Sequence, residues 1–118
     1  MKNIGLIGCG NIAETYFRAQ EYFNNINFVA CADINLDAAK KTAEQYKIIP
    51  LSVDEILNDK NVDIILNLTI PQAHYEISKR ALEANKHVYC EKPMSVKFDE
   101  AKELLNLAKK NSLYIGNA

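Results

Sequence analysis

The residues with the clearest chemical potential are the glycines of a short turn near the start of the chain. An apolar run, residues 3–7, leads into Gly8-x-Gly10-x-x-Ala13. Gly8 permits a tight bend out of a strand, Gly10 lets a diphosphate approach the backbone, and Ala13 lets the next helix pack closely. The free N–H groups of the first helical turn would then face the phosphates. The sequence therefore predicts a dinucleotide-binding turn, with a turn that binds nothing as the alternative. The residues of this predicted phosphate site are Gly8, Gly10, Asn11 and Ile12.

A carboxylate follows at the distance that such a site requires. Asp33 lies 20 residues after Ala13, at the end of a second apolar run, residues 27–33. A carboxylate there can accept both hydroxyls of an adenosine ribose. It would repel a 2′-phosphate, and no Arg follows in Ile34-Asn35-Leu36, so the sequence favours NAD over NADP. An acid that only caps the next helix is the alternative.

Two further polar loops follow predicted strands. The first, residues 69–74, contains Thr69, Ile70, Pro71 and His74, and the second is Glu91-Lys92-Pro93. Loops at carboxyl strand ends on both sides of a switch point line the ligand crevice of a doubly wound sheet. A partly desolvated lysine can act as an acid or a base, and histidine titrates in a suitable range. Taken alone, His74 fits a polar residue at a helix start better than a catalytic one, and Lys-Pro fits a surface turn.

Strand-like and helix-like segments alternate along the whole chain. Asn35 is expected to cap one helix, Ser52-x-x-Glu55 to form a capping box at another, and Asn85 to end a third in a left-handed conformation. This alternation predicts an α/β fold, a parallel sheet with helices on both faces. Right-handed crossovers favour the doubly wound Rossmann order 3-2-1-4-5-6. The predicted strands are 3–7, 27–33, 48–51, 62–69, 87–90 and 113–116, and the predicted helices are 11–22, 36–46, 53–58, 71–85 and 98–108.

Length and composition narrow the classes further. The 118 residues predict one domain, 1–118, and a net charge of −1 gives no basic excess for a nucleic-acid surface. The apolar runs are far shorter than the ~20 residues of a membrane span, and the first residues of the sequence do not resemble a signal peptide. The three cysteines have no metal-ligand spacing, so they are expected to be buried free thiols of a cytoplasmic protein, with no metal site. They are Cys9, Cys31 and Cys90.

With these motifs together, the chain resembles the N-terminal half of the Gfo/Idh/MocA oxidoreductases, which include glucose–fructose oxidoreductase and inositol dehydrogenase. The resemblance covers the whole chain and is most specific at residues 86–93, Lys-His-Val-Tyr-Cys-Glu-Lys-Pro. It implies a dehydrogenase that passes hydride from a CH–OH group of a sugar or polyol to NAD(P). It further implies that residues 8–13 bind the pyrophosphate and Asp33 the adenosine ribose. The loop 69–74 and residues 91–93 would line the nicotinamide side, with Lys92 taking part in proton transfer.

The chain departs from the family pattern in three places. Ile70 stands where the family commonly has proline, and Lys97 stands where a Ser or Thr often caps the last helix. Family members also continue into a second α/β domain, which supplies the substrate site and oligomer contacts, whereas this sequence stops after the sixth predicted strand. A cut-out domain and a natural stand-alone module both fit. We expect the 118 residues to bind dinucleotide with little turnover, and a homo-oligomer is a further expectation.

Two other function classes stay open from the sequence. A non-catalytic nucleotide-binding or interaction module would bind dinucleotide without needing Lys92. A methyltransferase using S-adenosylmethionine shares the strand, glycine turn and helix, but it has no use for Glu91-Lys92-Pro93.

Overall fold

The computed structural model describes residues 2–10, 12–19, 25–91, 95 and 97–117, and these form a parallel sheet flanked by helices. Within them the sheet has six strands in the order β3-β2-β1-β4-β5-β6, as the sequence predicts. The strands are β1 (Lys2–Ile7), β2 (Ile26–Ala32), β3 (Ile49–Pro50), β4 (Ile64–Asn67), β5 (His87–Cys90) and β6 (Ile115–Asn117). The helices are α1 (Ala13–Ala19), α2 (Leu36–Tyr46), α3 (Val53–Asn58), α4 (Pro71–Glu83) and α5 (Phe98–Lys110).

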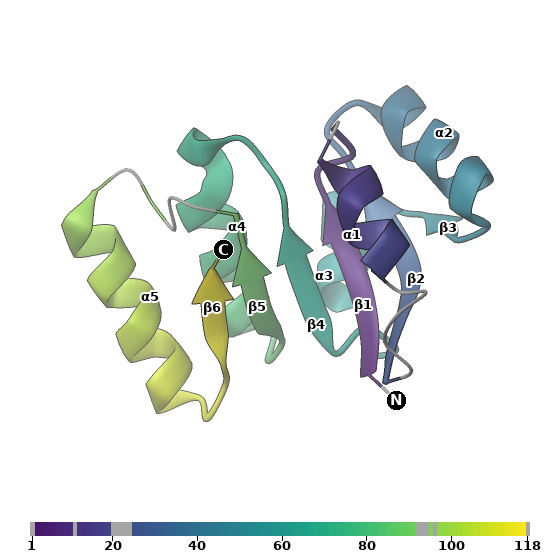
Figure 1. The fold of residues 1–118 in the computed structure, drawn as a ribbon. Helices are drawn as coiled ribbons and strands as arrows, with labels where there is room; N and C mark the ends of the chain where they lie inside the picture. The colour runs from purple at the N-terminus through teal and green to yellow at the C-terminus, as the bar shows by residue number, and fades with distance from the viewer. Residues whose placement is uncertain (1, 11, 20–24, 92–94, 96, 118) are drawn as a thin grey trace.

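The helices divide between the two faces of the sheet. Figure 1 shows α1 in front of β1, with α3 and α4 behind the sheet. One core cluster joins α1 and α2 to the sheet through Phe17 and Ala43, and the other joins α3, α4 and α5 through side chains such as Ile56, Leu82 and Leu104. The helix after β1 packs on the front face of the sheet and the helix after β4 packs on the back face. The topological switch point therefore lies between these two neighbouring strands.

Several helix ends follow the signals in the sequence. Asn35 accepts the N–H groups of Asp37 and Ala38 at the start of α2. Ser52 and Glu55 form the predicted capping box of α3. Asn85, just after α4, has a φ of 63°. Local side-chain chemistry therefore fixes these boundaries.

Two strands differ from their predicted ranges by two residues at an end, and the others agree to within one residue. The prediction 62–69 is too long at both ends of β4; at the carboxyl end, the Leu68 N–H still donates to Ile7 O, and the Asn67 side chain accepts the Thr69 N–H beyond it. The prediction 113–116 begins too early for β6, because the Leu113 N–H still bonds to Ala108 O of α5 and Ser112 is left-handed. Of the predicted helix 11–22, residues 13–19 are helical, while 11 and 20–22 lie outside the described residues.

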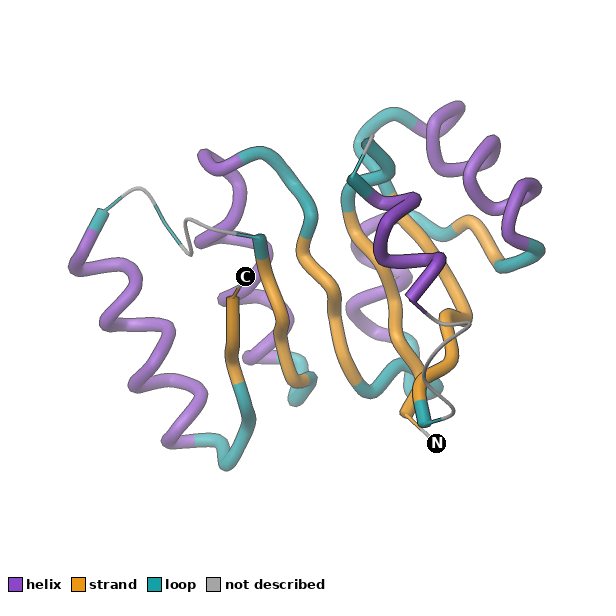
Figure 2. Tube along the Cα trace, in the orientation of Figure 1, coloured by secondary structure: helices purple, strands orange, loops and turns teal. Residues whose placement is uncertain are grey.

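Figure 2 shows loops joining these elements at both ends of the sheet. In the described part of the chain, no helix is long and apolar enough to cross a membrane. The site-bearing loops predicted from the sequence all leave the carboxyl ends of strands.

Candidate functional site

Gly8 holds the chain at the exit of β1 in a conformation that other residues rarely adopt. Its φ is 105°, and a Cβ atom there would lie 2.6 Å from the backbone carbon and oxygen of Leu68. Its N–H donates to Ala32 O at 2.9 Å. The turn is therefore fastened between β2 and the exit of β4, and it has no room for a side chain at this position.

Gly10 has the opposite environment. A Cβ atom there would meet no atom within 4 Å, and the residue is exposed. The backbone at Gly10 is consequently open to a ligand. Ile12 follows with 44% of its surface exposed, while Asn11 lies outside the described residues.

The Asp33 carboxylate ties the glycine turn to the loop after β2. Its Oδ2 accepts the Cys9 N–H at 2.7 Å, and its Oδ1 accepts the Asn35 N–H at 2.8 Å. Asp33 thus orients the entry to α2, as the capping alternative required, and it also stands beside the turn, as the ribose-binding interpretation required. Its partial exposure leaves acceptor capacity for a ligand hydroxyl.

These residues share one pocket of about 280 Å³ at the carboxyl edge of the sheet. Gly8, Gly10 and Asp33 form its polar side together with Thr69. Apolar side chains form the remaining wall, and two isoleucines at the pocket are strongly exposed, Ile34 at 96% and Ile70 at 66%. A flat apolar group can be covered on this wall while polar groups reach the turn. The apolar lining consists of Ile7, Ile34, Val53, Leu68, Ile70, Ala73 and Ile77.

Asn67 organises the loop that carries Thr69 and Ile70. The side chain is fully buried, and its amide donates to His74 O at 3.0 Å and to Ser78 Oγ at 2.9 Å. Its Oδ1 accepts the N–H of Thr69 at 3.2 Å and the hydroxyl of Thr69 at 2.6 Å. All four of its hydrogen-bonding positions are used. Asn67 was not predicted as a site residue, although a polar residue inside the run Ile64-Ile65-Leu66-Asn67-Leu68 is a signal in the sequence.

His74 lies beneath this loop and is 1% exposed. Its Nε2 is 2.6 Å from Thr69 O, and since a carbonyl only accepts, Nε2 carries the proton and donates. His74 therefore helps to hold Thr69 in place. Pro71 opens α4 as its first residue and is exposed.

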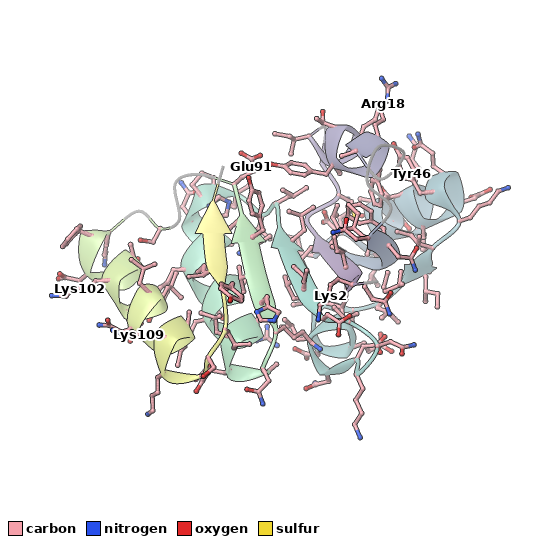
Figure 3. All side chains as sticks on the ribbon, turned by 60° about the horizontal axis from the view of Figure 1, so that its bottom comes forward. Lys2, Arg18, Tyr46, Glu91, Lys102 and Lys109 are labelled. Atoms are coloured by element: carbon pink, nitrogen blue, oxygen red, sulfur yellow. The ribbon has the colours of Figure 1, made fainter. Side chains whose placement is uncertain are left out.

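Glu91 follows β5 and reaches toward α1, as Figure 3 shows. Its N–H donates to Asn67 O at 3.1 Å, and its Oε1 accepts the hydroxyl of Tyr16. Burial and this bond to Glu91 both raise the pKa of Tyr16, so its hydroxyl stays protonated and donates. Lys92 and Pro93, predicted beside Glu91, lie outside the described residues. Tyr16 was not among the predicted site residues, and its partner is 75 residues away in the chain.

Within the described ranges, no group of three His, Cys, Asp or Glu side chains is placed to hold a metal ion. Cys31 and Cys90 are fully buried and Cys9 is half-buried, all as free thiols. The site therefore consists of a glycine turn, a carboxylate and an apolar wall, with Glu91 farther along the same edge of the sheet.

The model of a known family, described as "Oxidoreductase family, NAD-binding Rossmann fold", matches residues 2–117. The chain belongs to this Gfo/Idh/MocA family. The Gfo/Idh/MocA chain is thus an NAD(P)-binding oxidoreductase domain, and the predicted fold and family are confirmed.

Individual Gfo/Idh/MocA relatives agree with this assignment. An inositol 2-dehydrogenase of Azotobacter vinelandii is 33% identical over 108 residues, which are 88% of this chain and 32% of that enzyme. An uncharacterized oxidoreductase of Bacillus subtilis, YrbE, is 30% identical over 111 residues, covering 92% of this chain and 33% of the relative. The chain spans about a third or less of the length of the curated relatives it matches.

Solved structures show the same arrangement of elements. A 3-ketoreductase from Actinomadura kijaniata, in complex with NADP, superposes with a TM-score of 0.91 at 29% identity. The match covers 98% of this chain and 36% of that one. The Gfo/Idh/MocA domain therefore shares its whole architecture with a larger reductase chain.

Proposed function

We propose that this chain is the dinucleotide-binding part of a dehydrogenase that acts on a CH–OH group of a sugar or polyol, with NAD as its preferred cofactor. The observation that carries the proposal is the pocket in which Gly8, Gly10 and Asp33 meet an apolar wall. The open backbone at Gly10 suits a diphosphate, the Asp33 carboxylate suits ribose hydroxyls, and the exposed Ile34 and Ile70 suit an aromatic base.

The preference for NAD rests on charge at the pocket. The Asp33 carboxylate is held by two backbone N–H groups, so it cannot swing away from a nucleotide without losing both bonds. A 2′-phosphate beside it would meet a like charge, whereas a 2′-hydroxyl would find an acceptor. Some structural neighbours are NADP complexes, which makes this carboxylate the feature to test.

The proposed substrate class follows from the family and from the relatives named inositol 2-dehydrogenase. Bound NAD supplies the hydride acceptor. Lys92 is proposed to take the hydroxyl proton of the substrate, and Glu91 to line the same end of the groove. Lysine suits this role because a partly desolvated ammonium loses its proton near neutral pH.

The cofactor arm of the test compares NAD and NADP by calorimetry for the wild type and Asp33→Asn. Asparagine keeps the size of the side chain but removes its charge, so the preference for NAD should fall about tenfold. Asp37→Asn, at an exposed acid in the first turn of α2, is the matched control and should leave the preference unchanged. A wild type that binds NADP as well as NAD would contradict the assignment of NAD.

The catalytic arm measures turnover with a panel of polyols in the enzyme that carries this domain. Lys92→Ala should lower kcat by roughly 10²–10⁴-fold with little change in NAD affinity. Lys97→Ala, at an exposed lysine before α5, should not change kcat. NAD binding without any effect of Lys92→Ala would instead support the non-catalytic module.

A further inference from the structure

The bond between Tyr16 and Glu91 joins the two halves of the predicted groove. Tyr16 lies on α1, one turn after Ala13, and α1 begins directly after the glycine turn. Glu91 lies at the carboxyl end of β5. The Tyr16 hydroxyl donates to Glu91 Oε1, and the Tyr16 ring packs edge-on against Tyr89 of β5 with the ring centroids 6.4 Å apart.

Glu91 lies at the part of the sheet edge that the second nucleoside of a dinucleotide would reach. Asp33, which follows β2, would hold the adenosine ribose on the β2 side of the glycine turn. The second nucleoside of a dinucleotide must then extend to the other side, over β4 and β5. Neighbouring strands lie about 4.8 Å apart, so the end of β5 is roughly 10 Å from that of β1. Glu91 is the carboxylate at that distance.

Glu91 has acceptor capacity beyond the bond to Tyr16. A carboxylate has two oxygens and about four lone-pair sites, and the Tyr16 hydroxyl occupies one of them. The side chain is only partly buried, so a ligand can reach it. The backbone of Glu91 is fixed because its N–H donates to Asn67 O. The side chain can still rotate, and the bond from Tyr16 restricts that rotation.

We propose that Tyr16 is a positioning residue, whose hydroxyl holds the Glu91 carboxylate where it accepts a hydroxyl of the second ribose of the dinucleotide. This rests on the proposed function. It predicts that Tyr16 affects the affinity for the nucleoside beyond the pyrophosphate and leaves the affinity for adenosine diphosphate unchanged. A tyrosine that only braced α1 against β5 would affect both ligands alike.

The test compares NAD with ADP by calorimetry on the 118-residue chain. Tyr16→Phe keeps the ring against Tyr89 and removes the hydroxyl. NAD affinity should fall about three- to tenfold, the value of one hydrogen bond, while ADP affinity should change less than twofold. Tyr75→Phe is the matched control, because the Tyr75 hydroxyl makes the same type of bond to Glu103 between α4 and α5, away from the pocket.

Glu91→Gln provides a second route to the same conclusion. If Tyr16 acts through Glu91, the double variant Tyr16→Phe/Glu91→Gln should lose no more NAD affinity than Glu91→Gln alone. Additive losses in the double variant would overturn the proposal. An unchanged ratio of NAD affinity to ADP affinity in Tyr16→Phe, whether both affinities fall or neither does, would overturn it as well. A wild-type chain that binds neither nucleotide would overturn the proposed function itself. NAD binding that is unchanged in Tyr16→Phe would overturn only the role of Tyr16.

Discussion

The two glycines of the turn have different physical roles. Gly8 meets both a backbone conformation and a contact that exclude a Cβ atom. Gly10 has open space around it, so its lack of a side chain serves only an incoming group. Stability and binding can therefore be separated within three residues.

We expect Gly8→Ala to lower the free energy of unfolding by roughly 2–4 kcal/mol, because alanine adds strain at φ 105° and collides with the backbone of Leu68. Gly10→Ala should change stability by less than about 1 kcal/mol but weaken NAD binding at least severalfold. Urea denaturation and NAD titration of both variants measure the two effects. Equal stability of the two variants would contradict this division.

The residues that the sequence predicted, and those that it missed, differ in the range of their contacts. Gly8 and Asp33 belong to a motif with fixed spacing, so their place beside one pocket could be expected. The role of Tyr16 depends on a partner 75 residues away, and no local pattern marks it. Asn67 was hidden for another reason, because its polar side chain lies in a strand chosen for its apolar run.

At the scale of elements, a boundary marked by a capping residue was predictable, and a boundary without such a residue was not. The bounds of α2 and β5 were predicted as the structure has them, and for α2 the start is capped by its own neighbour, Asn35. The late start of β6 follows from the end of α5, where the Leu113 N–H bonds to Ala108 O and Ser112 is left-handed. Serine adopts this conformation uncommonly, so the sequence pattern did not signal the boundary.

Lys86 links two elements at the opposite edge of the sheet. It precedes β5, is 6% exposed, and donates to Asp59 O at 2.7 Å and Val62 O at 2.8 Å in the turn between α3 and β4. Lys86→Met should therefore destabilise the chain by about 1.5–3 kcal/mol in urea denaturation, since two carbonyls lose a charged donor. Lys60→Met, at an exposed lysine of the same turn, should cost less than about 0.5 kcal/mol.

The destabilisation caused by Lys86→Met should also depend on pH. Burial lowers the pKa of Lys86, so the unfolded chain binds more protons than the folded chain in the window below the ordinary lysine pKa of about 10.4. Stability from this group therefore rises with pH through that window. The destabilisation by Lys86→Met should be larger at pH 10 than at pH 8, and a smaller value at pH 10 would contradict this sign.

At the scale of the whole molecule, the described helices cover the front face of the sheet near β1 and β2 and leave it open near β5 and β6. Side chains of α1 and α2 pack with those of β1, β2 and β4 on the front face, while no described helix lies in front of β5 and β6 (Figure 1). Tyr89 and Tyr114 are consequently exposed, at 39% and 80%. Glu91 stands at the carboxyl end of this uncovered face, so the second half of a dinucleotide meets little obstruction from the described residues.

Because the predicted ligand touches loops from β1, β2 and β4, it can bind only when the sheet is assembled, and binding must stabilise the whole domain. NAD at 100 times its dissociation constant should raise the free energy of unfolding by about 2.7 kcal/mol. With a urea m-value of about 1–3 kcal/mol/M, the unfolding midpoint should rise by roughly 1–3 M. Gly10→Ala should show a smaller shift at the same NAD concentration, because its folded state binds less tightly. A midpoint that S-adenosylmethionine raises and NAD does not would contradict the dinucleotide assignment.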